Sequence, residues 1–161
     1  MPTPLPALLD HYEDQLDRSI TALIFQVARN LGTAIDRRMA PFNITGQQAA
    51  LLLRSCVVSN QTPSQLAPWL GTDNAGITRL LDRLEAKGFI VRRMSVTDRR
   101  AIVVEPTEAG RALVPHLVPA FRAVVAQLLD GFAEEERPLL ESLLRRLLDN
   151  VEMCEHGDGH D

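Results

Sequence analysis

The chain has 161 residues, the length of one ordinary domain or of one module with a partner-dependent extension. With 45% hydrophobic and 24% charged residues it can bury a core, which excludes wholesale disorder and a fibrous repeat. Aromatic residues supply only 4%, which favours aliphatic helix packing over a β-sandwich, and the net charge of −4 argues against nucleic acid when the chain is taken as a whole.

The first predicted helix is very long. Apolar residues recur at helical spacing from residue 8 to residue 35, which predicts one helix reaching about Met39. A domain of this size cannot cover such a stripe, so we expect a second copy of the chain to bury it.

The start of the chain lacks the basic region of a secretory leader, and the apolar runs are too short to cross a bilayer, so we expect a cytoplasmic protein without a membrane partner.

Three short helices follow Pro41. Thr45 and Thr62 each begin a T-x-x-Q capping box, which predicts helices from residue 46 to about 58 and from Pro63 up to the glycine at 71. Asp73 is placed to cap the third helix, and Gly88 stands where a left-handed C-terminal cap belongs. Helices in this succession, separated by a tight turn, predict a helix-turn-helix.

A hairpin is predicted directly after these helices. Residues 89–94 and 101–105 are rich in β-branched side chains and are joined by a polar tip with two adjacent arginines. A hairpin in this place is the wing of a winged helix.

Two further helical regions complete the chain. Apolar spacing from Thr107 to about residue 129 predicts a helix, with a kink or break between residues 112 and 118 because of Pro115 and Pro119. After Gly131, acidic residues and then a leucine-rich face predict a final helix, followed by a disordered tail at 156–161.

The predicted fold class is therefore mostly α (α+β), a winged helix-turn-helix whose terminal helices form an intertwined homodimer. Residues 41–106 are assigned to DNA binding, and residues 1–40 and 107–155 to dimerisation. The dimerisation candidates are apolar residues of both helical regions: Leu8, Tyr12, Leu16, Leu117, Phe121, Leu140, Leu144, Leu147, Leu148 and Val151.

Charge is concentrated in one segment. Residues 79–100 carry seven bases against three acids, whereas the other 139 residues have a net charge of −8. Because electrostatic fields in solution are local, a basic segment in an acidic chain predicts a phosphate-contacting face.

Residues 72–113 contain four motifs in a fixed order: the run ITRLLDRLE at 77–85, then Lys87-Gly88, the wing motif Asp98-Arg99-Arg100 and the segment TEAG at 107–110. With these motifs the segment resembles the MarR family of bacterial transcriptional regulators. The resemblance implies a dimer that binds a pseudo-palindromic operator, usually as a repressor, and that often releases it when a phenolic or other small aromatic compound binds. Pro115, Pro119 and the acidic tail are not part of the shared signature.

Double-stranded DNA is the expected partner. The N-terminal part of a recognition helix meets base edges in the major groove, and the resemblance implies that Arg99 enters the minor groove, oriented by Asp98. Capping alone would equally explain several of these polar residues, and a solvated surface would explain the arginines. The DNA-contact candidates are Ser64, Gln65, Asp73, Asn74, Ala75, Gly76, Thr78, Arg79, Arg83, Arg92, Asp98, Arg99 and Arg100.

An effector pocket is expected between the dimerisation helices and the winged module. An arginine beside aromatic walls can hold an aromatic carboxylate, although each candidate is also explained by packing or by surface exposure. The candidates are His11, Tyr12, Arg18, Phe25, Arg29, Arg54, Trp69 and His116.

Other classes of function have little support. The sequence contains no phosphate-binding glycine loop and no hydrolase or metalloprotease motif, so an enzyme is not expected, and no cofactor or metal is predicted. Cys56 is interpreted as an inert core residue, and Cys154 with the histidines near it as part of a loose tail. The alternatives to a ligand-released repressor are a winged-helix interaction module and a constitutive or redox-responsive DNA binder.

Overall fold

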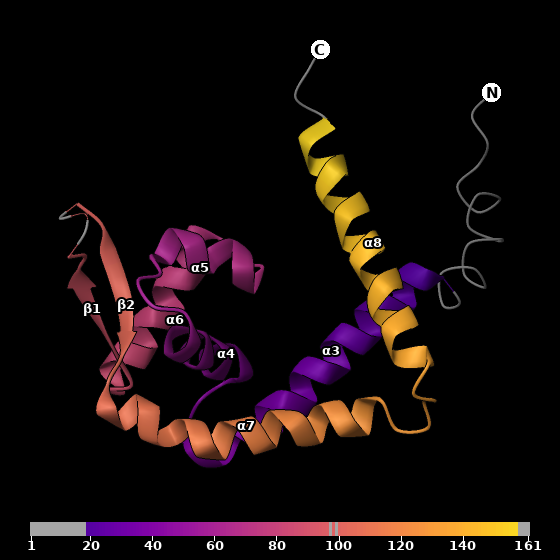
Figure 1. Cartoon of the computed structure of the whole chain (residues 1–161), viewed down its shortest axis with the longest axis horizontal. Helices are drawn as coiled ribbons and strands as arrows, with labels where there is room; N and C mark the ends of the chain where they lie inside the picture. Colours follow the sequence, from indigo (N-terminus) through magenta and orange to yellow (C-terminus); the bar gives the residue numbers. More distant parts are fainter. Residues whose placement is uncertain (1–18, 97, 99, 158–161) are drawn as a thin grey trace, which may run out of the picture. The chain divides into compact units, whose positions relative to one another are not determined.

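The computed structural model describes residues 19–96, 98 and 100–157 (Figure 1). Within this part the chain is mostly helical, with one antiparallel two-stranded sheet, as predicted. It divides into two compact units, the first ending at Val124 and the second starting at Val125. The elements in chain order are α3 (Ile20–Met39), η1 (Ala40–Phe42), α4 (Gly46–Val57), α5 (Pro63–Leu70), α6 (Asn74–Ala86), β1 (Ile90–Met94), β2 (Ile102–Pro106), α7 (Glu108–Leu128) and α8 (Glu136–Gly157).

Helix α3 is shorter than the sequence pattern predicts. Ser19 has an extended backbone, and its hydroxyl accepts a hydrogen bond from the amide of Ala22, so the helix begins at Ile20. Its 20 residues span about 30 Å at 1.5 Å per residue. One uninterrupted helix through residues 8–39 is therefore wrong, because apolar periodicity does not reveal where a serine caps a new helix. Residues 1–18, with Leu8, His11, Tyr12, Leu16 and Arg18, lie outside the described part.

Helices α4, α5 and α6 begin at the predicted caps. The hydroxyls of Thr45 and Thr62 accept hydrogen bonds from the backbone amides three residues further on. In each box the glutamine side chain accepts in turn from the backbone amide of the threonine. Asp73 Oδ1 accepts from the amide of Gly76 at 2.6 Å to start α6. The helix ends before Gly88, whose φ of +73° is the left-handed conformation that glycine adopts without strain.

The wing is the hairpin of β1 and β2, in which Arg92 pairs with Val104 and Met94 with Ile102. Beyond β2 lies an isolated bridge, where the amide of Val104 donates to the carbonyl of Gln61 at 2.9 Å. This bond fastens the wing to the segment between α4 and α5.

The core of the first unit lies between the short helices, the sheet and the first half of α7. Its fully buried side chains come from each of these elements, which makes the helices and the wing one packed module. They include Met39, Leu51, Leu52, Leu66, Ile77, Leu81, Leu84, Val104 and Leu117.

Helix α7 is continuous through both of its prolines. Pro115 and Pro119 are four residues apart, hence on one face, and both are exposed, so the carbonyls that lose partners lie on the solvent side. A break in this helix is therefore wrong. Leu117, a dimerisation candidate, is fully buried in the core of its own chain, and Phe121 is half-buried against that core.

Helix α8 carries an exposed apolar face. Leu140 is half-buried, while the other described candidates of this helix are exposed, among them Leu144, Leu147, Leu148 and Val151. The helix extends to Gly157, two residues into the segment expected as a tail, and residues 158–161 lie outside the described part. No helix among the described residues is long and apolar enough to span a membrane.

Candidate nucleic-acid interface

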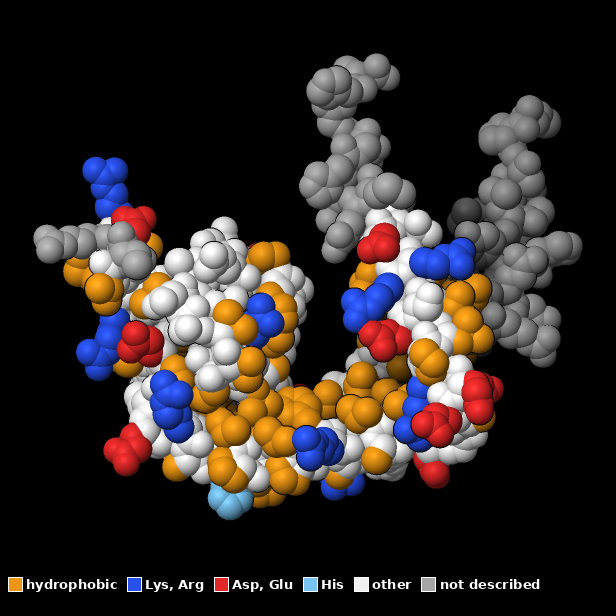
Figure 2. All heavy atoms as spheres, in the orientation of Figure 1, with side chains coloured by type: hydrophobic (Ala, Val, Ile, Leu, Met, Phe, Trp, Pro, Cys, Tyr) orange, Lys and Arg blue, Asp and Glu red, His pale blue; other side chains and the backbone are white. Residues whose placement is uncertain are grey.

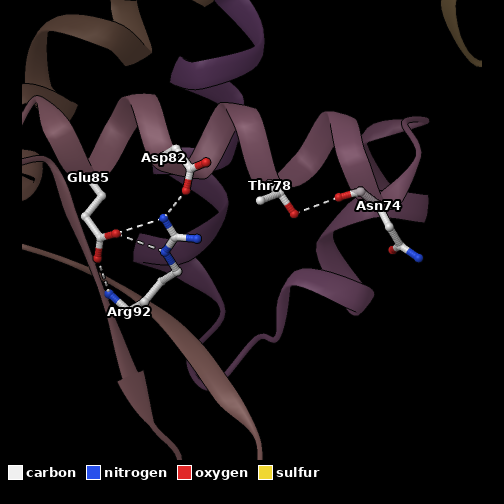
Figure 3. Close-up of polar contacts among 5 residues, drawn as sticks. All are labelled: Asn74, Thr78, Asp82, Glu85 and Arg92. Atoms are coloured by element: carbon white, nitrogen blue, oxygen red, sulfur yellow. Dashed lines mark hydrogen bonds and ion pairs between the residues drawn. The ribbon is translucent and has the colours of Figure 1, made fainter.

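Helix α6 has one buried and one exposed face. Ile77, Leu81 and Leu84 pack into the core, whereas the side chains of Asn74 and Arg79 are exposed. The exposed hydroxyl of Thr78 donates to the carbonyl of Asn74 at 2.7 Å, and Figure 3 shows the two residues on one side of the helix. The polar candidates at the start of α6 therefore form a continuous surface that the core does not use.

The small residues at the start of α6 differ in their reason for being small. Ala75 is exposed. A Cβ on Gly76 would lie 2.2 Å from the hydroxyl of Thr72 and 2.8 Å from the carboxylate of Asp73, so a larger residue there would have to displace the side chains that start the helix.

Ser64 and Gln65 lie at the start of α5. Both side chains are exposed, but both are also used locally: Gln65 Oε1 accepts from the amide of Thr62 at 3.0 Å, and the Ser64 and Thr62 hydroxyls lie 2.9 Å apart. Their position at a helix N-terminus suits a phosphate, while their hydrogen bonds have a structural role of their own.

The tip of the wing is organised by Asp98. Its carboxylate accepts from the amide of Arg100 at 2.9 Å, and its own amide donates to the hydroxyl of Ser95 at 3.3 Å. Arg100 is exposed, and Arg99 lies outside the described part. Basic side chains lie over the wing in Figure 2, so the wing presents positive charge to solvent.

Arg92 differs from the other wing arginines because carboxylates of α6 surround it. Its guanidinium donates to Asp82 and, at 3.0 and 2.8 Å, to Glu85 (Figure 3). Hydrogen bonds from Arg92, first from its backbone amide and then from its side chain, hold the pKa of Glu85 below its ordinary value. Hydrogen bonds to Asp82 and Glu85 raise the pKa of Arg92 itself. Sequence reasoning missed both carboxylates, since nothing in their spacing indicates that a strand residue seven or ten positions away would reach them.

Arg83 borders a cavity instead of only facing solvent. The cavity has a volume of about 430 Å³ and is lined by residues of α3, α4, α5, α6 and α7 within the first unit. Its lining residues include Ile35, Asp36, Gln47, Leu70, Leu80, Arg83 and Phe121.

The effector candidates do not meet at this cavity. Arg54 stacks over Trp69 at 5.0 Å from the ring centroid and donates from Nε to Gln61 at 3.0 Å, so these two side chains brace the helices. Phe25 and Arg29 are exposed on α3, and His116 lies 6.0 Å from the ring of Phe42. Of the candidates within the described part, none lines the cavity.

Cys56 is half-buried, and burial raises the pKa of its thiol against a smaller opposing effect of Arg111. A raised pKa keeps the sulfur protonated and unreactive at neutral pH. Among the described residues, no group of three or more acidic, histidine or cysteine side chains is arranged to hold a metal ion.

The capped helices, the exposed face of α6 and the wing define a winged-helix protein. The MarR family model matches residues 48–102, which run from α4 to the start of β2, so this part of the chain is a MarR-family domain.

Known proteins with similar sequences and structures agree with this assignment. The chain is 32% identical over 113 residues to the transcriptional repressor MprA of Escherichia coli strain K12; the match covers 70% of this chain and 64% of that protein's length. The crystal structure of the transcriptional regulator SlyA superposes with a TM-score of 0.77 at 26% identity, covering 83% of this chain and 94% of that one. The crystal structure of MarR superposes with a TM-score of 0.71 at 28% identity, covering 86% and 94%.

Proposed function

We propose that this protein is a cytoplasmic transcriptional regulator of the repressor type that binds double-stranded DNA, and not an enzyme. The observation that carries the proposal is the exposed polar face of α6 beside a wing with a basic tip, in a chain whose net charge is otherwise acidic. Similarity to proteins named as a transcriptional repressor and a transcriptional regulator supports it.

Helix α6 would enter the major groove with its N-terminal residues toward the bases. Asn74 has an amide that can pair with adenine, and Thr78 and Arg79 follow it on the exposed surface. The start of α5, with Ser64 and Gln65, would meet the phosphate backbone, because amides at a helix start favour anions. The wing would follow the adjacent minor groove through Arg99, with Arg100 near phosphate.

Two copies would act together on a pseudo-palindromic operator. Helices α3 and α8 each expose large apolar side chains, such as Ile24 and Phe25 on α3 and Leu147 and Leu148 on α8. Stripes of this kind favour burial in a second copy, which would set the two α6 helices about 34 Å apart on successive major grooves. In this assignment residues 41–106 bind DNA, and the flanking helical regions hold the dimer together.

A small ligand would release the operator. The cavity of about 430 Å³ is within the size range of ligand pockets, and it combines apolar walls with Arg83 and Asp36. It includes Leu80 and Arg83 of α6 and Ile35 of α3, so a ligand there would contact the DNA-binding helix and a dimerisation helix at once. Ligand binding would favour a spacing of the two α6 helices that no longer matches the operator.

Selection of bound sequences from a random duplex library tests the proposal. The purified protein should enrich a palindromic site of roughly 16–20 base pairs and should bind it with an affinity that falls steeply as salt rises. No enriched site, with only weak salt-sensitive binding, would favour a winged-helix module that recognises another protein. Small aromatic acids can then be tested for release of the selected duplex, with Arg83→Ala as the variant expected to resist release.

A further inference from the structure

The guanidinium of Arg92 connects the wing to helix α6. Glu85 accepts from both Nε and the terminal nitrogen of Arg92, and Asp82, one turn earlier, accepts from that terminal nitrogen as well (Figure 3). Only 25% of the Arg92 side chain is exposed, against 66% for its neighbour Arg93. Charge-assisted bonds to two carboxylates satisfy the cation within the protein.

The backbone of Arg92 is held by the same carboxylate. Its amide donates to Glu85 Oε1 at 3.0 Å, outward from the hairpin, while the amide of the paired Val104 donates outward to Gln61 on the other edge. Arg92 and Val104 are therefore a non-hydrogen-bonded pair of the antiparallel hairpin, in which both amides point away from the partner strand. Each of these amides needs an acceptor outside the hairpin. Glu85 supplies it on the α6 side, which fixes the strand at this residue.

We call the contact of Arg92 with Asp82 and Glu85 the clamp; it lies on the side of α6 that is proposed to face DNA. Asn74, Thr78, Asp82 and Glu85 follow one another at intervals of four, four and three residues and so share one face of the helix, as Figure 3 shows. The residues proposed to meet the bases and the residues that hold the wing therefore belong to one stripe of one rigid helix.

We propose that Arg92 is a positioning residue that sets the angle between the wing and α6, so that both can engage DNA at the same time. This inference rests on the proposed function. It replaces the predicted DNA contact of Arg92 with an indirect role, and it assigns Asp82 and Glu85 to the same role although each places a negative charge near a polyanion.

Because Glu85 is negatively charged, direct electrostatics and positioning predict opposite effects of its removal on DNA affinity. Glu85→Gln removes an acid from the DNA-facing side, so simple electrostatics predicts tighter binding. Positioning predicts the opposite: affinity of the full-length protein for its selected duplex falls about tenfold, or about 1.4 kcal/mol. In an Arg92→Met background the same substitution should cause no further loss, because the clamp is already broken. Arg93→Met, one residue along the strand, is the matched control and should not be coupled to Glu85→Gln.

Amide hydrogen exchange without DNA supplies the second readout. Glu85→Gln and Arg92→Met should speed exchange in β1 and β2 while leaving the core of α4 and α5 protected, which also shows that the variants fold. Tighter or unchanged binding by Glu85→Gln, or additive effects of the two substitutions, would overturn the positioning role in favour of a direct contact. If the wild-type protein selects no duplex although its wing is protected, the proposed function fails instead, and with it the role in DNA binding.

Discussion

Gly110 lies directly against the carbonyl of Phe89. A Cβ on Gly110 would be 2.1 Å from that oxygen and 3.0 Å from Leu52 Cδ1. The contact joins the start of α7 to the residue just before β1, and Thr107 strengthens the junction by donating from its hydroxyl to the Gly88 carbonyl at 2.6 Å. The end of α6, the wing and α7 therefore meet at one tightly packed point.

Gly110→Ala should destabilise the protein. The clash is with backbone, which cannot move aside like a flexible side chain, so we expect a loss of about 1–3 kcal/mol in the free energy of unfolding. Gly32→Ala is the matched control, because a Cβ there meets nothing within 4 Å and the residue is inside α3. That change should stabilise the chain by about 0.5–1 kcal/mol. Denaturant titration of both variants measures the change in the free energy of unfolding. Equal changes for the two variants would contradict a clash at Gly110.

Arg79→Ala should weaken DNA binding without loss of stability. Arg79 is exposed on α6, so its removal leaves the core intact. Loss of one phosphate contact lowers the slope of log affinity against log salt by about 0.9 for each chain. Arg122→Ala on α7 removes the same charge from another exposed position and controls for net charge. An identical salt-dependence slope for the Arg79 and Arg122 variants would contradict contact of Arg79 with DNA.

Leu148→Asp should disrupt association of two copies. The side chain is 63% exposed in the single chain, so the change cannot empty the core of that chain. A buried charge without a partner is costly, and the dimer should give way to monomer in light scattering at micromolar concentration. Arg146→Ala, an exposed change on the same helix, should leave the mass unaltered. A wild-type protein that is already monomeric would refute the dimer.

Cys56 should react slowly. Burial raises the pKa of its thiol, so little thiolate is present at neutral pH. In a Cys154→Ser variant, alkylation by iodoacetamide should be slower at pH 7 than that of a free thiol and should accelerate as pH rises. Peroxide should leave DNA binding of this variant intact. Fast modification at pH 7 would revive the redox-responsive alternative.

The carboxylate of Glu85 predicts a dependence of stability on acid pH. Its pKa in the folded protein lies below the ordinary value of 4.5, so its contribution is complete above that pH and is lost as pH falls through the folded pKa. The difference in Tm between wild type and Glu85→Gln should be constant from pH 7 to about 5 and should shrink at lower pH. A Tm difference that grows as the pH falls would contradict the ion pair of Glu85 with Arg92.

Features set by neighbouring residues could be predicted from the sequence. The caps at Thr45, Thr62 and Asp73 and the left-handed Gly88 each depend on fewer than five consecutive residues, and all are present. The hairpin was predictable because β-branched runs on both sides of a polar tip leave few alternatives.

Features set by the approach of distant segments could not be predicted. The side chain of Arg92 reaches Asp82 across the turn at Gly88, and the small size of Gly110 is required by the carbonyl of Phe89, just before β1. Arg83 borders a cavity because residues of α3, α4, α5 and α7 line the same space, and no local pattern predicts that. The start of α3 was missed for the opposite reason: Ser19 interrupts an apolar repeat that continues on both sides of it.

The affinity of the purified protein for its selected palindromic duplex, compared with a scrambled duplex of equal length at the same salt concentration, tests the central claim most directly. A regulator that reads bases through α6 should bind the selected site at least about a thousandfold more tightly, with two chains on each duplex. Equal affinity for the two duplexes at every salt concentration would contradict sequence-specific recognition by this winged helix.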